Sequence, residues 1–230
     1  MANKIKFHAS QEVLDAYPHP FPSRKALPEW FKKLPPSVEH HPRGSSVKKC
    51  IPFLEACSEG FIIPFFCDVW VNARDDNIKF EFAEKKLSDG MSSHQIQQVE
   101  GHPFEDMPFG TIPMKFHNPW VIETPKGYSC YFMSPLNRLE KRFKLFDGIV
   151  DTDNYYSHVN LPFLWTGGDG DFLIKKGTPL VQVIPFKRQT FKSEVAVLDQ
   201  RRENKVRNKL LTFFNSGYRR LYWHKMEKEK

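Results

Sequence analysis

The apolar and polar positions of residues 48–188 predict a series of short strands. Residues 50–82 have a strand-like pattern, with a nearly continuous apolar run over 61–71 in which Pro64 marks a break or an edge. Residues 78–82 then alternate between apolar and polar side chains, as the return strand of a hairpin does. Turn residues separate the further runs that we expect to be strands: 114–123, 128–133, 148–151, 159–165, 172–174 and 180–186. The pattern predicts a mainly β fold, built as a barrel or sandwich.

The two flanks of this β domain have different patterns. Residues 1–47 form a proline-rich N-terminal arm, with one short helix expected over 26–34 before Pro35. Residues 84–110 are polar and lack periodicity, so we expect an insertion loop within the β-barrel domain of 48–188.

The last segment, 189–230, predicts a basic amphipathic helix and tail. Apolar residues recur there at helical spacing from Val195 to Phe213, with Ser193 as a possible N-cap and Gly217 as the stop.

Composition refines this prediction in one respect, because the charge is unevenly placed. The chain has a formal charge of +7, yet 13 Lys and Arg face only 5 Asp and Glu from Lys187 onward, a net of +8. The rest of the chain therefore sums to about −1. A nucleic acid could bind this C-terminal helix through its cations, with Tyr218, Tyr222 and Trp223 stacking on bases. The alternative is a helix whose charges are simply solvated.

The start of the chain and its cysteines bear on location. No apolar run follows the first lysines, and no later segment approaches the roughly 20 apolar residues of a membrane span. The four cysteines are too few for a disulfide scaffold and lack the close pairing of zinc sites. We expect a cytoplasmic protein with reduced thiols, no membrane partner and no dedicated metal site.

Three segments resemble the trimeric dUTP pyrophosphatase and dCTP deaminase superfamily. A turn at 125–127 leads into a strand, Gly-Ile-Val-Asp stands at 148–151 with tyrosines just beyond, and 172–184 has an apolar strand, a Lys-Gly turn and a strand carrying glutamine. The segment 66–69 is similar to the first motif of that family. The whole chain also resembles a family common in tailed phages and some bacteria, which implies a bacterial host cell.

The resemblance implies a nucleotide site with magnesium, located between the subunits of a homotrimer. It assigns Asp151 the role of positioning or deprotonating the attacking water, and it assigns a nucleotide-binding role to Tyr155 or Tyr156, Arg138, Asn137, Gln182 and Asp68. A deoxynucleoside triphosphate pyrophosphohydrolase is the activity so implied. Two other functions stay open: a non-enzymatic β-barrel with a structural or host-interaction role, and nucleic-acid binding through the basic tail.

Overall fold

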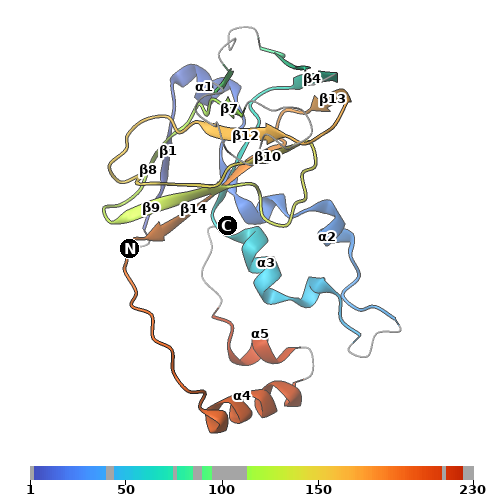
Figure 1. Ribbon diagram of the computed structural model, residues 1–230, viewed down its shortest axis with the longest axis vertical. Helices are drawn as coiled ribbons and strands as arrows, with labels where there is room; N and C mark the ends of the chain where they lie inside the picture. The colour runs from blue at the N-terminus through green and yellow to red at the C-terminus, as the bar shows by residue number, and fades with distance from the viewer. Residues whose placement is uncertain are drawn as a thin grey trace.

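The protein is mainly β, as the sequence predicts. The computed structural model describes residues 3–39, 44–74, 77–84, 90–94, 113–213 and 216–224. Within these ranges every strand pairing is antiparallel, and short helices lie at both ends of the chain (Figure 1). The predicted insertion loop 84–110 lies largely outside the described residues.

The largest sheet has the strand order β11-β9-β14-β3-β2. Its strands are β11 (Gly148–Val150), β9 (Tyr128–Met133), β14 (Pro179–Lys187), β3 (Phe61–Pro64) and β2 (Phe21–Pro22). The edge strand β2 belongs to the N-terminal arm, so the arm completes the sheet as well as covering it.

A second sheet has the order β10-β12-β7-β6. Its strands are β10 (Phe143–Leu145), β12 (Leu161–Trp165), β7 (Met114–Phe116) and β6 (Met91–Ser93). A separate sheet has only two strands. The arm strand β1 (Lys6–His8) pairs with β8 (Val121–Glu123).

The predicted hairpin is present and belongs to a third sheet of order β13-β4-β5. It joins β4 (Val69–Arg74) to β5 (Asn77–Phe82), and β13 (Gly170–Ile174) pairs with the other edge of β4. Side chains of β4 are buried and exposed in strict alternation, as expected for a strand with one face on the core.

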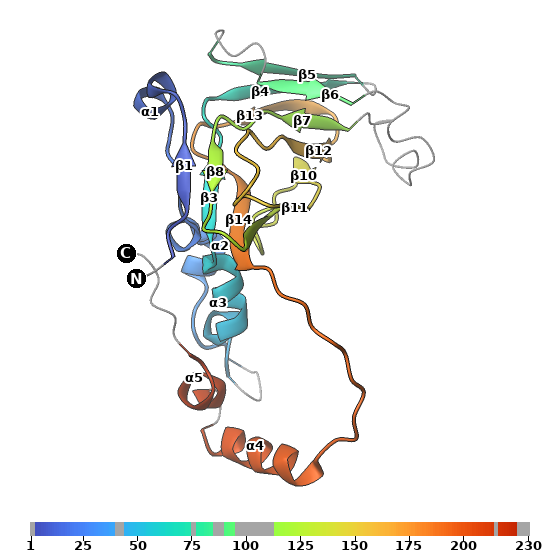
Figure 2. The ribbon, with the colours of Figure 1, turned by 90° about the vertical axis from the view of Figure 1, so that its left-hand side faces the viewer.

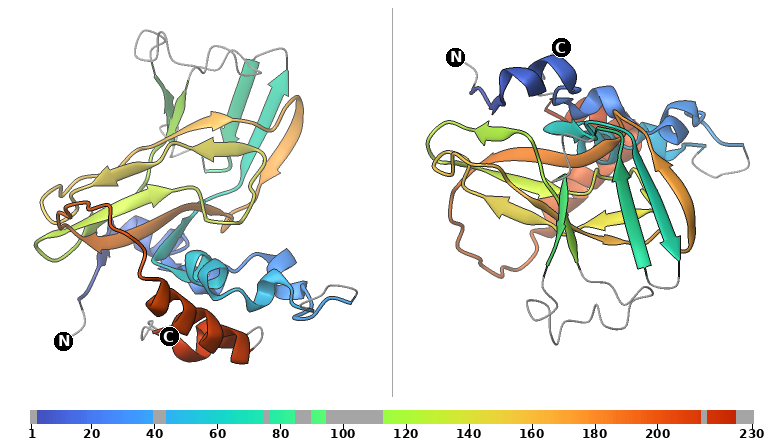
Figure 3. Two further views of the ribbon diagram at one scale, coloured as in Figure 1. Left: turned by 60° about the horizontal axis from the view of Figure 1, so that its bottom comes forward. Right: turned by 90° about the horizontal axis from the view of Figure 1, so that it is seen from above.

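Strands from these sheets lie around a common interior, as the ribbon in Figure 3 shows, and the side chains that fill it include many aromatic rings. Phe116 and Phe163 stack with ring centroids 3.8 Å apart, and Phe80, Phe65 and Trp165 pack edge-on around this pair or its neighbours. The phenylalanine-rich composition is therefore explained by one aromatic core.

The helices of the first 60 residues differ from the prediction. The short helix expected over 26–34 is found as α2 (Glu29–Lys33), but α1 (Gln11–Ala16) and α3 (Ile51–Ser58) were not expected. The prediction of strand for α3 was wrong. Its residues are apolar enough to resemble a buried strand, yet Pro52 in the first turn fits a helix start better than a strand.

The C-terminal segment is helical, but its helix begins and ends elsewhere than predicted. Residues 188–199 run as an extended segment away from the sheets (Figure 2), and α4 (Gln200–Thr212) starts at an N-cap of Asp199. Gly217 opens the next helix, α5 (Gly217–Leu221), instead of ending the first. No residue of α4 is buried, so the helix does not bury an apolar stripe on the sheets. No helix among the described residues is long and apolar enough to cross a membrane.

Candidate functional site

An open hollow of about 620 Å³ lies beside the end of β11. Its polar lining side chains are Asp151, Asn154, Tyr155, His158 and Asn160. Asp151 follows directly after the strand, and the backbone N–H groups of Asn154 and Tyr155 both donate to its carbonyl oxygen. This tight turn brings a carboxylate and an aromatic ring to the same hollow.

The carboxylate of Asp151 is held by one of its two oxygens. Its Oδ1 accepts a hydrogen bond of 2.6 Å from the Ser129 hydroxyl and lies 3.1 Å from Nη1 of Arg188. Its Oδ2 has no hydrogen-bond donor among the described residues, and the side chain is 63% exposed. The group is therefore fixed in place and retains an oxygen with which to accept a proton or a hydrogen bond.

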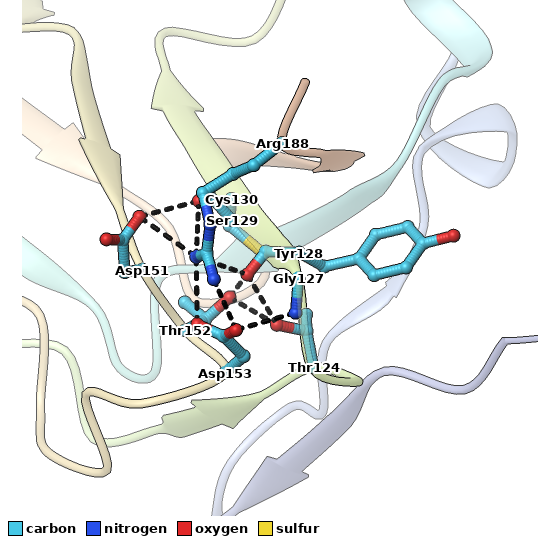
Figure 4. A network of polar contacts seen from close by, with 9 residues as sticks. All are labelled: Thr124, Gly127, Tyr128, Ser129, Cys130, Asp151, Thr152, Asp153 and Arg188. Atoms are coloured by element: carbon cyan, nitrogen blue, oxygen red, sulfur yellow. Dashed lines mark hydrogen bonds and ion pairs between the residues drawn. The ribbon is translucent and has the colours of Figure 1, made fainter. Parts of the chain in front are cut away.

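Arg188 connects the two aspartates that flank Thr152, as Figure 4 shows. Its guanidinium binds both oxygens of Asp153, one of them at 2.8 Å from Nη1, and Gly127 N–H donates to the same carboxylate at 2.7 Å. Together the guanidinium and the backbone N–H lower the pKa of Asp153 to about 2. Only 5% of the Asp153 side chain is exposed, so its ion pair with Arg188 has a structural role beneath the hollow.

A layer of buried side chains ties this network to β9. The hydroxyls of Thr124 and Thr152 share a hydrogen bond of 2.7 Å, and Thr152 also donates to Sγ of Cys130. Burial raises the pKa of the Cys130 thiol to about 11, so it stays protonated and unreactive at neutral pH. These hydrogen bonds of Thr152 hold the turn that follows Asp151 against Thr124 and Cys130.

The two tyrosines named by the sequence have different surroundings. Tyr155 is 49% exposed and lines the hollow with Asp151. Tyr156 packs edge-on against His8 of β1, with ring centroids 5.3 Å apart. Tyr155 is therefore the better candidate for a ring that stacks on a ligand.

Gln182 lies apart from this hollow. Its side chain is 1% exposed, donates to the carbonyls of Ala56 and Glu59 at 3.0 and 2.7 Å, and accepts from Leu136 N–H at 2.8 Å. Arg188, which follows the last residue of β14, is six positions further along the chain, a span of about 20 Å in extended backbone. Within one chain, Gln182 and Asp151 do not share a cleft.

Asn137 and Arg138 lie close to Gln182, in the loop after β9. Asn137 adopts a left-handed backbone with a φ of 58°, and its amide contacts Sγ of Cys57. Arg138 donates to the carbonyl of Ala26 at 3.0 Å, and its partial burial lowers the pKa of its guanidinium. The structure thus brings these two predicted residues together with Gln182, at a distance from Asp151.

Asp68 is in a third place. Its Oδ1 accepts a hydrogen bond of 2.6 Å from the backbone N–H of Lys176, in the turn between β13 and β14. In this position it stabilises a turn of the barrel.

Two residues of the Asp151 network were not predicted from the sequence, namely Ser129 and Arg188. Their side chains meet because β9 and β14 pair antiparallel, with Ser129 opposite Phe186. Ser129 and Arg188 can be paired only when the register of β9 and β14 is known, and no local sequence motif indicates that register.

The residues around Asp151 do not form a site for a protein-held magnesium ion. The described residues contain no group of three His, Cys, Asp or Glu side chains that could hold a metal. The guanidinium of Arg188 already binds Asp151 and Asp153, the two adjacent carboxylates that would be the natural ligands.

The low pKa of Asp153 makes a prediction about acid stability. The carboxylate titrates near 3.8 when unfolded and near 2 when folded, so its contribution is complete above about pH 4 and is lost as the pH falls toward about 2. We expect Asp153→Asn to be less stable than the parent at neutral pH, and the difference in urea midpoint to shrink through this window. A difference that stays constant from neutral pH down to about pH 2 would contradict the assignment.

Comparison with known proteins gives structural likenesses only. No family model matches the chain, and no curated protein matches it in sequence. Among solved structures, the dUTPase of EIAV is 10% identical with a TM-score of 0.35, covering 62% of this chain and 87% of that one. A dUTPase of Staphylococcus bacteriophage 80alpha is 9% identical with a TM-score of 0.35, covering 62% and 78%. The dUTPase of phage phi11 of S. aureus is 9% identical with a TM-score of 0.33, covering 62% and 84%.

Proposed function

We propose that the hollow beside Asp151 binds a nucleotide and that the protein hydrolyses a deoxynucleoside triphosphate to its monophosphate and pyrophosphate. The observation that carries this proposal is a fixed carboxylate with one oxygen free of protein donors, next to an exposed tyrosine in an open hollow. The activity belongs in the cytoplasm of a bacterial host cell, where its substrates are made.

The roles of the residues follow from their positions. The ring of Tyr155 offers a face on which a deoxyribose can pack, and Asn154 and Asn160 offer polar groups to a ligand. The free oxygen of Asp151 accepts a proton from a water molecule that attacks the α-phosphorus, the bond from that phosphorus to the oxygen bridging to the β-phosphoryl group breaks, and pyrophosphate leaves. Ser129 and Arg188 hold the carboxylate by its other oxygen, so that the orientation of the base does not depend on the ligand.

The phosphates need cations that this hollow lacks within one chain. Arg188 is neutralised by Asp153, and the described lining contains no lysine or arginine. A nucleoside triphosphate binds magnesium in solution, and this ion neutralises part of the negative charge of the phosphates without protein ligands. A neighbouring subunit would supply the remainder, and the loop that carries Arg138 and Asn137 is the candidate surface on that neighbour.

This reasoning predicts a homotrimer with sites between its subunits. We expect light scattering at micromolar concentration to give a mass three times the 27.0 kDa of one chain. Arg138→Met is then expected to weaken nucleotide binding although Arg138 is far from Asp151 in its own chain. A monomer under these conditions would contradict the proposed site between subunits.

The experiment that tests the activity is pyrophosphate release from a panel of deoxynucleoside triphosphates with magnesium. We expect slow release from at least one of them. If none is cleaved but one is bound, the protein is a nucleotide-binding module without hydrolysis.

A further inference from the structure

A second hollow, of about 550 Å³, lies between α3 and the C-terminal helix α5. Figures 2 and 3 show the two helices side by side, below the sheets and away from the end of β11. Its lining comes from both ends of the chain. Lys48, Lys49 and Leu54 belong to the N-terminal half, and Phe213, Arg219 and Trp223 belong to the C-terminal segment.

The charge of this hollow is uncompensated. Three cations line it, and the described lining contains no carboxylate. The ammonium of Lys48 donates to the carbonyl of Lys32 at 2.6 Å, and that of Lys49 to the hydroxyl of Ser37 at 3.2 Å. The guanidinium of Arg219 lies 5.9 Å from the centroid of the Trp223 ring. These three contacts are to neutral groups, and three positive charges along one lining favour the binding of an anion in the hollow.

The indole of Trp223 adds an independent observation. Its Nε1 is buried and has no hydrogen-bond acceptor in the described structure. A buried donor without an acceptor is costly, and an acceptor supplied by a bound molecule or ion is one way to satisfy it. Trp223 itself lines the hollow, beside the apolar side chains of Phe213 and Leu54.

We propose that this hollow binds a small organic anion with an aromatic ring, bearing a phosphate or a carboxylate. The anionic group is held by Lys48, Lys49 and Arg219, and the ring packs against Trp223 and Phe213. The volume is within the range of small-molecule sites, about 300–1,000 Å³. The site does not rest on the proposed function of Asp151, because it shares no lining residue with that hollow.

The test uses phenyl phosphate as the probe. Inorganic phosphate represents its anionic group alone, and phenol represents its aromatic ring alone. Titration is followed through the indole N–H signal of Trp223 in nitrogen-15 spectra, which Trp223→Phe assigns. We expect phenyl phosphate to move this signal and to bind at least about tenfold tighter than either half, because it alone combines a charged hydrogen bond with a packed ring; tenfold corresponds to about 1.4 kcal/mol. Thymidine monophosphate, as a second probe, shows whether a nucleotide is accepted as the source of the same chemistry.

Variants of the cations separate this site from general attraction to the basic tail. Arg219→Met and Lys49→Met are each expected to weaken binding about tenfold, whereas Lys205→Met, which removes an exposed charge of α4, is expected to leave it unchanged. Equal weakening of phenyl phosphate binding by all three variants would show a nonspecific polyanion surface instead. The same conclusion would follow if an oligonucleotide bound tightly and Lys205→Met weakened its binding as much as Arg219→Met does. The proposal is also overturned if the parent binds neither phenyl phosphate nor thymidine monophosphate.

Discussion

Gln182→Met is expected to lower the free energy of unfolding by about 3 kcal/mol, because it removes three hydrogen bonds to partly buried backbone groups. The carbonyls of Ala56 and Glu59 lie at the end of α3, where helices have unsatisfied acceptors. The Gln182 amide caps them and also accepts from Leu136 in the loop after β9. Methionine has a similar volume, so the loss is of hydrogen bonds and not of packing.

Urea denaturation measures this effect, with Gln200→Met as the matched control. Gln200 is exposed at the start of α4, and the same substitution there is expected to change stability by less than about 0.5 kcal/mol. A Gln182→Met protein as stable as the parent, but defective in nucleotide binding, would contradict the structural role of Gln182. It would favour the direct nucleotide contact that the sequence resemblance implies.

The strand pattern of the domain is predictable from local sequence, whereas α3 is not. Alternation identifies the β4–β5 hairpin because one face of that sheet is buried and the other exposed. The residues of α3 are mostly apolar, and the carbonyls at its C-terminal end accept hydrogen bonds from Gln182, more than 120 residues away. Pro52 is a local signal for the start of this helix, whereas the group that caps its end belongs to a distant strand and leaves no signal in the segment.

The candidate site divides in the same way. Asp151 and Tyr155 are brought together by one short turn, so a local motif finds them. Ser129 and Arg188 join them only through the register of β9 and β14. Arg138 and Asn137 follow a strand end in the sequence as Asp151 does, and only the sheet order shows that they lie elsewhere.

The second prediction of large effect concerns the proposed base. Asp151→Asn is expected to reduce any pyrophosphate release by a factor of about 10² to 10⁴, because an amide cannot accept the proton of the attacking water. The amide oxygen can still accept from the Ser129 hydroxyl, and Arg188 remains paired with Asp153, so the turn should keep its geometry. The control is Asp169→Asn, which changes an exposed carboxylate in the turn before β13 and should leave the rate unaltered.

The nucleotide hollow itself is tested most directly by calorimetric titration of the parent and of Asp151→Asn with a panel of deoxynucleoside triphosphates in magnesium. The geometry predicts that both proteins bind at least one of them with similar affinity, since the substitution removes a proton acceptor and preserves the lining. If the parent binds none of them, the nucleotide site is contradicted. The chain would then be a β-barrel protein with a structural or host-interaction role.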